Sequence, residues 1–159
     1  AYGATLKSGP VLVSRDYWKV SQMISRAVVS GLASVGIEVQ NLESMSLPIS
    51  RYYVKTQRAT GLVHVRVSQR EIEKITIEFF DSQGVAITKP MERKIETTFF
   101  KEDFPRCAPS DVGSISFPSR VREYYVDEFL NHVKVDKVIY FCKQVGIFSI
   151  FCVFYFLVD

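Results

Sequence analysis

The sequence predicts an α/β protein with three layers, α/β/α, built around a mixed but mostly parallel sheet. Short apolar runs typical of buried strands alternate along the chain with longer segments of helical periodicity. Such alternation requires crossover connections, which place successive strands parallel to one another with helices on both faces of the sheet. The chain has 159 residues, of which 47% are apolar and 23% are charged, and therefore suits one domain with a sizeable core.

The first strand and the first helix begin this alternation. Val11–Val13 is a short apolar strand, and helical periodicity starts at Trp18. We expect Ser14 or Asp16 to cap this helix and Gly36 to end it, since these residue types favour the two helix termini. The predicted inner face consists of apolar residues that recur mostly at spacings of three and four: Val20, Met23, Ile24, Ala27, Val28, Gly31, Leu32 and Val35.

Three further strands and a second helix follow. Ile37–Leu42 is the second predicted strand, and Ile49–Arg58 is a helix that Pro48 opens. Leu62–Val67 and Ile75–Phe80 are the third and fourth strands. Only a short loop joins these last two strands, so the pair can be antiparallel, and the predicted sheet is therefore mixed.

The second half of the chain is predicted to be mainly helix and loop. Pro90–Phe100 is a helix, Phe104–Pro118 is a proline-rich loop, and Arg120–Val133 is a last amphipathic helix. The predicted inner side of that helix carries Val121, Tyr124, Tyr125, Phe129 and Val133. We therefore expect one domain over residues 1–134. The apolar tail behind it, 135–159, is interpreted as a truncated or aberrant start of a second domain.

Composition and spacing exclude several classes of function. The net charge is only +3 and the basic residues are scattered, so we expect no nucleic-acid partner. Cys107, Cys142 and Cys152 lack metal-ligand spacing and suit free thiols in a reducing compartment. This favours the cytoplasm, with a plastid as the alternative. His64 and His132 lie far apart in the sequence and are interpreted as structural residues, so we predict no metal site.

Ser68 is the catalytic candidate in this sequence. It occupies a polar loop directly after a buried strand, a place where several phosphotransfer enzymes present a nucleophile. Arg15, Arg66 and Arg70 are candidates for contacting a phosphate, because a guanidinium matches phosphate oxygens in pairs. Asp16 and Arg15 follow another strand and can meet the Ser68 loop, since parallel strands end at one edge of the sheet. The structural alternatives are an ion pair within the domain and a serine that bonds to local backbone.

Several motifs occur in the order found in a known family. Ser14-Arg15-Asp16 corresponds to a G-R-D element, and Ser68 corresponds to the serine of a catalytic T-A-S-H-N-P loop. Ile77–Phe80 followed by Gly84 corresponds to a G-I-K-F-F strand and its P-D-G turn. From Val11 to Val133 the chain therefore resembles the first domain of the phosphohexomutase superfamily, which contains phosphoglucomutases and phosphomannomutases.

A narrower resemblance concerns mutase-like modules fused behind the nucleotidyltransferase domain of some sugar-1-phosphate guanylyltransferases, which make GDP-mannose. Four short motifs are similar: Ala1-Tyr2-Gly3, His64-Val65-Arg66-Val67, Met91–Glu96 and Phe100-Lys101-Glu102-Asp103. This resemblance implies a parent of the mannose-1-phosphate guanylyltransferase type. The remaining domains of such a longer parent would then be the partners of this chain.

The mutase resemblance implies that Ser68 passes a phosphoryl group to and from a hexose phosphate, with Mg²⁺ held by a D-G-D-x-D-R loop in a later domain. That loop does not occur in this sequence, so we expect no cofactor in the chain itself. Gln69, Arg70 and Glu71 replace the family's His, Asn and Pro, and Trp18 replaces its second Arg. We therefore expect a non-catalytic or regulatory domain with a degenerate active site. The alternative is a mutase fragment that performs intramolecular phosphoryl transfer through Ser68.

The last residues of the sequence are unusually apolar. Val145–Val158 is a run of 14 residues almost without polar groups, whereas a membrane-spanning helix needs about 20. Its aromatic and β-branched residues favour strand over helix and make the tail an aggregation hazard. We expect no membrane partner, and a tail-anchored membrane protein is the third alternative.

Overall fold

The centre of the protein is a five-stranded sheet, as seen in a computed structural model that describes residues 1–6, 9–71, 73–102 and 104–132. The strands are β1 (Val11–Arg15), β2 (Val39–Ser44), β3 (Gly61–Val67), β4 (Ile75–Asp81) and β5 (Ile115–Ser116). Their order across the sheet is β4-β3-β1-β2-β5. β1 is parallel to β2 and β3, β5 is parallel to β2, and β4 is antiparallel to β3. The prediction of a mixed, mostly parallel sheet is confirmed.

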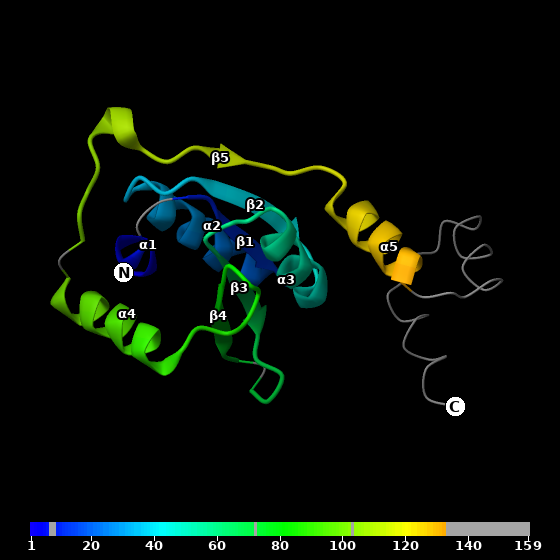
Figure 1. Ribbon diagram of the computed structural model, residues 1–159. Coiled ribbons are helices and arrows are strands. Elements are labelled where there is room, and N and C mark those ends of the chain that lie inside the picture. Colours follow the sequence, from blue (N-terminus) through cyan, green and yellow to red (C-terminus); the bar gives the residue numbers. More distant parts are fainter. Residues whose placement is uncertain (7–8, 72, 103, 133–159) are drawn as a thin grey trace. The chain divides into compact units, whose positions relative to one another are not determined.

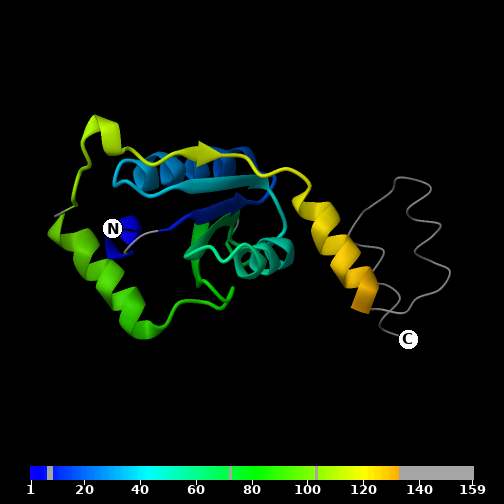
Figure 2. The ribbon, with the colours of Figure 1, turned by 45° about the horizontal axis from the view of Figure 1, so that its top comes forward.

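Helices cover both faces of this sheet (Figures 1 and 2). The helices are α1 (Tyr2–Thr5), α2 (Lys19–Ala33), α3 (Leu47–Thr56), α4 (Lys89–Lys101) and α5 (Val121–His132), with a 3₁₀ turn at Pro109–Asp111. α3 packs against Leu12 and Leu62 on one face. α2 packs against Val13 and Val63 on the other face, where α1 and α4 join the same apolar cluster. The predicted three-layer α/β/α arrangement is therefore confirmed.

The buried face of α2 differs from the predicted one. Val20 and Met23 were expected inside but are 40% and 60% exposed. The helix instead turns two small serines toward the sheet. The helix itself satisfies one of them, because the Ser25 hydroxyl donates to the Gln22 carbonyl oxygen at 3.1 Å, whereas the Ser21 hydroxyl has no partner among the described residues. The buried residues of α2 are Ser21, Ser25, Val29, Leu32 and Ala33.

The predicted caps of α2 are also corrected. Ser14 lies within β1, and the N-cap position of α2 is Trp18, without a side-chain cap. Asp16 lies two residues before this N-cap, and its Oδ1 accepts a hydrogen bond from the Trp18 N–H at 3.0 Å. Gly36 has a left-handed φ of 79°, which glycine adopts readily, but the C-cap is Ser34, two residues before it.

Three local features differ from the prediction, one at the N-terminus and two in the second half of the chain. The helix α1 was not predicted, and β5 lies inside the segment predicted to be loop. β5 escapes a sequence pattern because both of its residues are exposed, and its docking depends on the backbone, with the Val39 N–H donating to the Ser114 carbonyl oxygen at 2.8 Å. Tyr124, expected on the inner side of α5, is 52% exposed, whereas Val121 is buried.

Contacts divide the chain into two compact units, Ala1–Tyr125 and Val126–Asp159. The predicted boundary between residues 134 and 135, and the apolar tail behind it, lie outside the described residues, so both stay predictions. Among the described residues, the helices are too short or too polar to span a bilayer. The candidate site lies in the first unit.

Candidate active site

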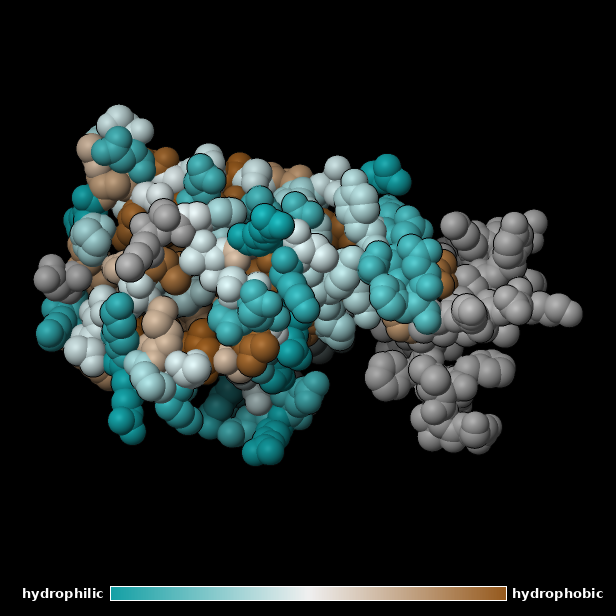
Figure 3. All heavy atoms as spheres, in the orientation of Figure 1, coloured by the Kyte–Doolittle hydropathy of each residue, from teal (hydrophilic) through white to brown (hydrophobic). Residues whose placement is uncertain are grey.

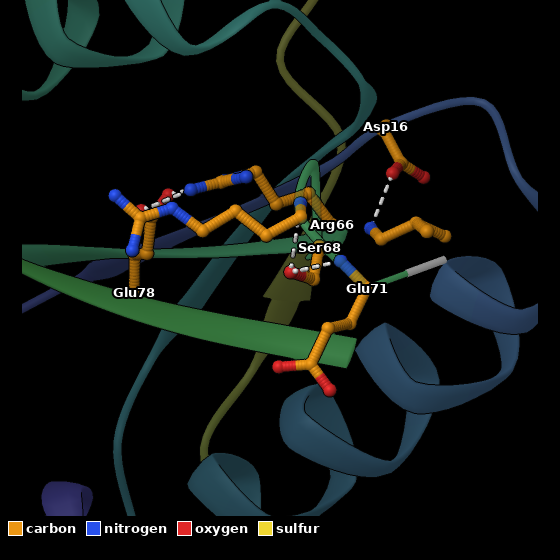
Figure 4. Close-up of polar contacts among 7 residues, drawn as sticks. Asp16, Arg66, Ser68, Glu71 and Glu78 are labelled. Carbon is orange, nitrogen blue, oxygen red and sulfur yellow. Dashed lines mark hydrogen bonds and ion pairs between the residues drawn. The ribbon is translucent and has the colours of Figure 1, made fainter. Parts of the chain in front are cut away.

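The candidate site lies beyond the carboxyl ends of β1 and β3. β1 has β2 on one side and β3 on the other, so these ends flank the topological switch point where open α/β sheets usually bind ligands. Asp16 follows β1 and joins the two strand ends. Its Oδ2 accepts a hydrogen bond from the Val67 N–H at 2.7 Å (Figure 4), and its own N–H donates to the Val65 carbonyl oxygen at 3.0 Å. The carboxylate therefore holds the start of the Ser68 loop against β1.

Ser68 is half-buried, and its hydroxyl serves the loop that contains it. The Oγ accepts hydrogen bonds from the backbone N–H groups of Arg70 at 3.4 Å and Glu71 at 3.3 Å (Figure 4). The Ser68 N–H donates to the Lys74 carbonyl oxygen at 2.8 Å, which closes the loop. This is a serine turn, in which the side chain mimics a backbone acceptor. Among the described residues, no carboxylate or imidazole hydrogen-bonds to Oγ.

The residues that replace the family's His, Asn and Pro point mainly into solvent. Gln69, Arg70 and Glu71 are all exposed. Glu71 forms an ion pair with Lys74, at 2.5 Å, across the turn of the loop. Arg70 has no ion-pair partner among the described residues, so its guanidinium is the free cation nearest to Ser68 in the sequence.

Arg66 is already paired. Its Nε and Nη2 donate to the two carboxylate oxygens of Glu78 at 2.9 and 2.8 Å (Figure 4). The hydrogen bonds from Arg66 lower the pKa of Glu78, and in return the bond to Glu78 raises the pKa of Arg66. A two-pronged pair of this kind is among the stronger ionic contacts in proteins. A phosphate that approached Arg66 would therefore have to compete with Glu78.

Ser14 and His64 form a buried pair within the sheet, where Ser14 of β1 lies opposite His64 of β3. Ser14 is fully buried and His64 is 4% exposed, and the Ser14 Oγ lies 2.8 Å from His64 Nδ1. Burial lowers the pKa of His64, although the nearby Glu78 carboxylate opposes that shift. Burial thus disfavours the protonated imidazole, and its Nδ1 faces the Ser14 hydroxyl. His64 was interpreted as structural from its position in the sequence, but its partner was not predicted, because only the strand register places Ser14 opposite His64.

Arg15 lies beside a separate cleft of about 300 Å³ at the ends of β1 and β2. Its Nη1 donates to the Asp16 carbonyl oxygen at 2.8 Å. We call this feature the arginine cleft. The residues that line it include Arg15, Glu43, Pro118, Arg120, Arg122 and Glu123. No sequence pattern points to Arg120 and Arg122, since they lie in a different part of the chain and look like ordinary residues at a helix start.

A metal site is not formed by the residues that the structure describes. No three His, Cys, Asp or Glu side chains come together there in a way that could hold a metal ion. The mutase resemblance places its Mg²⁺ on a D-G-D-x-D-R loop of a later domain, a motif that does not occur in this sequence.

Known proteins of similar sequence share this domain. The profile of the family described as phosphoglucomutase/phosphomannomutase, alpha/beta/alpha domain I, matches residues 1–106. A phosphoglucosamine mutase of Lactobacillus acidophilus is 35% identical over 108 residues, which are 67% of this chain and 24% of that protein. A probable phosphoglucosamine mutase of Pyrococcus abyssi is 28% identical over 136 residues, or 86% of this chain and 30% of that protein. The chain thus spans about a quarter to a third of these relatives.

Solved structures agree on the fold. A putative phosphomannomutase from Thermus thermophilus superposes with a TM-score of 0.69 at 23% sequence identity, covering 84% of this chain and 30% of that one. At that identity the likeness concerns the fold alone. Taken with the family profile and the order of motifs around Ser68, it leads to one conclusion: the chain belongs to the phosphoglucomutase/phosphomannomutase family, of which it contains the α/β/α domain I.

Proposed function

We propose that this domain has lost phosphoryl transfer and serves as an accessory or regulatory part of a larger sugar-phosphate or sugar-nucleotide enzyme. The observation that carries the proposal is the surroundings of the Ser68 hydroxyl. Oγ accepts hydrogen bonds from two backbone amides, and no described side chain is placed to take its proton. A serine without such a partner is a weak nucleophile near neutral pH.

The neighbouring charges support the same proposal. Phosphoryl transfer depends on positioning and on neutralising the charge that develops in the transition state. Gln69 cannot act as a general acid or base near neutral pH, and His64 is buried against Ser14. Arg66 is paired with Glu78. Among the described residues of the loop, Arg70 is the one cation without an ion-pair partner. One exposed guanidinium supplies only a small part of the charge neutralisation that phosphoryl transfer needs.

The proposal is tested by offering the protein a phosphoryl donor. We expect no phosphoserine at Ser68 after incubation of the full chain with glucose 1,6-bisphosphate or glucosamine 1,6-bisphosphate, as read by phosphopeptide mass spectrometry. The phosphoglucosamine mutase of Lactobacillus acidophilus, treated in parallel, is the positive control. Stoichiometric phosphate on Ser68, absent from a Ser68→Ala variant, would contradict the proposal.

One observation favours the alternative, in which a mutase uses Ser68. The amides of Arg70 and Glu71 both point at Oγ, and the Arg70 guanidinium belongs to the same loop. Converging amides of this kind can also hold phosphoryl oxygens. Under the alternative, the phosphoserine would form slowly in the native chain and faster in a Gln69→His, Arg70→Asn, Glu71→Pro variant. No phosphoserine in either protein would leave the accessory role standing.

The parent enzyme is proposed to be of the guanylyltransferase type. The proposal is supported by the four short motifs that resemble mutase-like modules fused to nucleotidyltransferases, and the cysteine pattern favours a cytoplasmic setting. The sequence of the complete transcript tests it. We expect a nucleotidyltransferase signature upstream of Ala1, whereas a D-G-D-x-D-R motif downstream of Asp159 would favour a true mutase.

A further inference from the structure

We propose that the arginine cleft binds the phosphate group of a phosphate monoester, or inorganic phosphate, at a site separate from Ser68. This inference goes beyond the proposed function and does not depend on it. The cleft is built from three segments that are distant in sequence: the end of β1, the end of β2 and residues 118–123 at the start of α5. Its volume of about 300 Å³ is at the lower limit for small-molecule sites.

The charges in the cleft favour an anion. Arg15, Arg120 and Arg122 take part in none of the ion pairs among the described residues. Arg15 donates to one backbone carbonyl, Arg122 donates to the Ser44 carbonyl oxygen at 2.8 Å, and Arg120 lies over the Tyr124 ring. Because a guanidinium carries five N–H donors, each arginine keeps donors for a ligand.

Two carboxylates in the cleft set the selectivity. Glu43 and Glu123 line it beside the three arginines, which leaves one net positive charge from the five side chains, plus the partial positive charge of the α5 N-terminus. Carboxylates can accept hydrogen bonds from hydroxyl groups but repel an anion. The combination therefore suits a phosphate that is attached to a polyhydroxylated or otherwise polar group better than a bare hydrophobic acid.

The backbone around the cleft is shaped to bring these side chains together. The pairing of β1 with β2 shifts register between Val13 and Ser14, and the extra residue on β2 is Leu42, whose side chain stays in the core. Glu43, directly after this bulge, has a left-handed φ of 54°, and Arg120 has one of 60°. Bulges and left-handed residues of this kind redirect side chains at functional sites.

The residues that line the cleft include none from the Ser68 loop. The family profile matches residues 1–106, whereas Arg120, Arg122 and Glu123 lie beyond that match. Arg122 ties this later segment to β2 through its bond to Ser44. The cleft therefore depends on the segment that follows the profile match, and Ser68 is not among its lining residues.

The test is isothermal titration calorimetry of the full chain with inorganic phosphate. The ionic strength is held constant with chloride. We expect saturable binding at one site. An Arg120→Gln, Arg122→Gln double variant should bind at least tenfold more weakly. The matched control is Arg26→Gln, Arg93→Gln, which removes the same charge from exposed positions on α2 and α4 and should bind as the native chain does.

Two further variants keep the test decisive if the double variant folds poorly. Glu43→Gln removes a repelling charge and should tighten phosphate binding, whereas Ser68→Ala should leave it unchanged. Absence of saturable binding, equal weakening in the control variant, or loss of binding in Ser68→Ala would each overturn the proposal. Covalent phosphoserine tests the proposed function, and reversible binding tests the cleft, so the failure of one is distinguishable from the failure of the other.

Discussion

At Ser68, one hydroxyl oxygen accepts hydrogen bonds from two backbone amides of its own loop. The sequence could predict that this serine lacks partners, because Gln69 and Glu71 are its local neighbours. It could not predict that Arg66 is unavailable, because Glu78 lies on the next strand and meets Arg66 only through the register of the hairpin. The identity of the neighbouring residues thus predicts which partners Ser68 lacks. Only the pairing of β3 with β4 shows that Arg66 is already bound to Glu78.

The buried His64 predicts a pH-dependent stability. Burial lowers the pKa of His64 below the 6.5 expected in the unfolded chain. As the pH falls below 6.5 the unfolded state takes up a proton that the folded state resists, so the free energy of unfolding should decrease until the pH reaches the folded pKa. The loss is about 1.4 kcal/mol for each unit by which the two pKa values differ. Urea unfolding between pH 5 and 8 measures it.

A non-titrating variant isolates this effect. His64→Asn retains a polar group beside Ser14 but cannot take up a proton, so its stability should be lower overall and flatter between pH 5 and 6.5. His132→Asn removes an exposed imidazole and is the matched control, with the native slope expected. If His64→Asn keeps the full native slope, the pH dependence has another origin.

At the scale of the element, α2 shows where a periodic pattern misleads. The helix was predicted correctly over most of its length, but its buried stripe contains Ser21 and Ser25 while Met23 faces outward. Spacing rules assume that apolar side chains define the inner face. Here close packing on the sheet favours small residues, so the polar Ser21 and Ser25 are buried and the apolar Met23 is exposed. The strand β5 escaped prediction for the related reason that neither of its residues is buried.

The buried hydroxyl of Ser21 gives an element-scale prediction. Among the described residues, Ser21 Oγ is buried without a hydrogen-bond partner. Leaving a polar group in that condition costs about 1–3 kcal/mol, so Ser21→Ala should raise the free energy of unfolding by about 1 kcal/mol or more. Ser30→Ala, at an exposed position of the same helix, is the control for helix propensity. Equal effects of the two variants in chemical unfolding would show that the Ser21 hydroxyl is satisfied in solution.

At the scale of the whole molecule, the strand and helix alternation predicted the architecture. The three layers and the antiparallel last hairpin follow from segment lengths and connection lengths, which are local properties. The order of β1 between β2 and β3 places the ends of β1 and β3 at the switch point, and Asp16 joins them. That arrangement holds the Ser68 loop whether or not the serine reacts.

A shorter chain tests the predicted domain boundary. We expect residues 1–134 to fold alone with a cooperative thermal transition, because both apolar clusters lie within residues 1–125. On the face in Figure 3, the described residues show apolar side chains in small patches among polar ones. The shorter chain should therefore remain monomeric in size-exclusion chromatography at concentrations where the full chain, with its apolar tail, aggregates. Equal aggregation of the two would remove the tail as the cause.

The sequence by itself determined the family of this protein, the alternation of its strands and helices, and the loss of the residues that assist the family's serine. These are read from neighbouring residues and their spacing. Only the tertiary structure decided that His64 pairs with Ser14, that Glu78 holds Arg66, and that Arg15 shares a cleft with Arg120 and Arg122. The reason is physical: such contacts depend on strand order and register, which bring together side chains from distant parts of the chain that no local pattern connects.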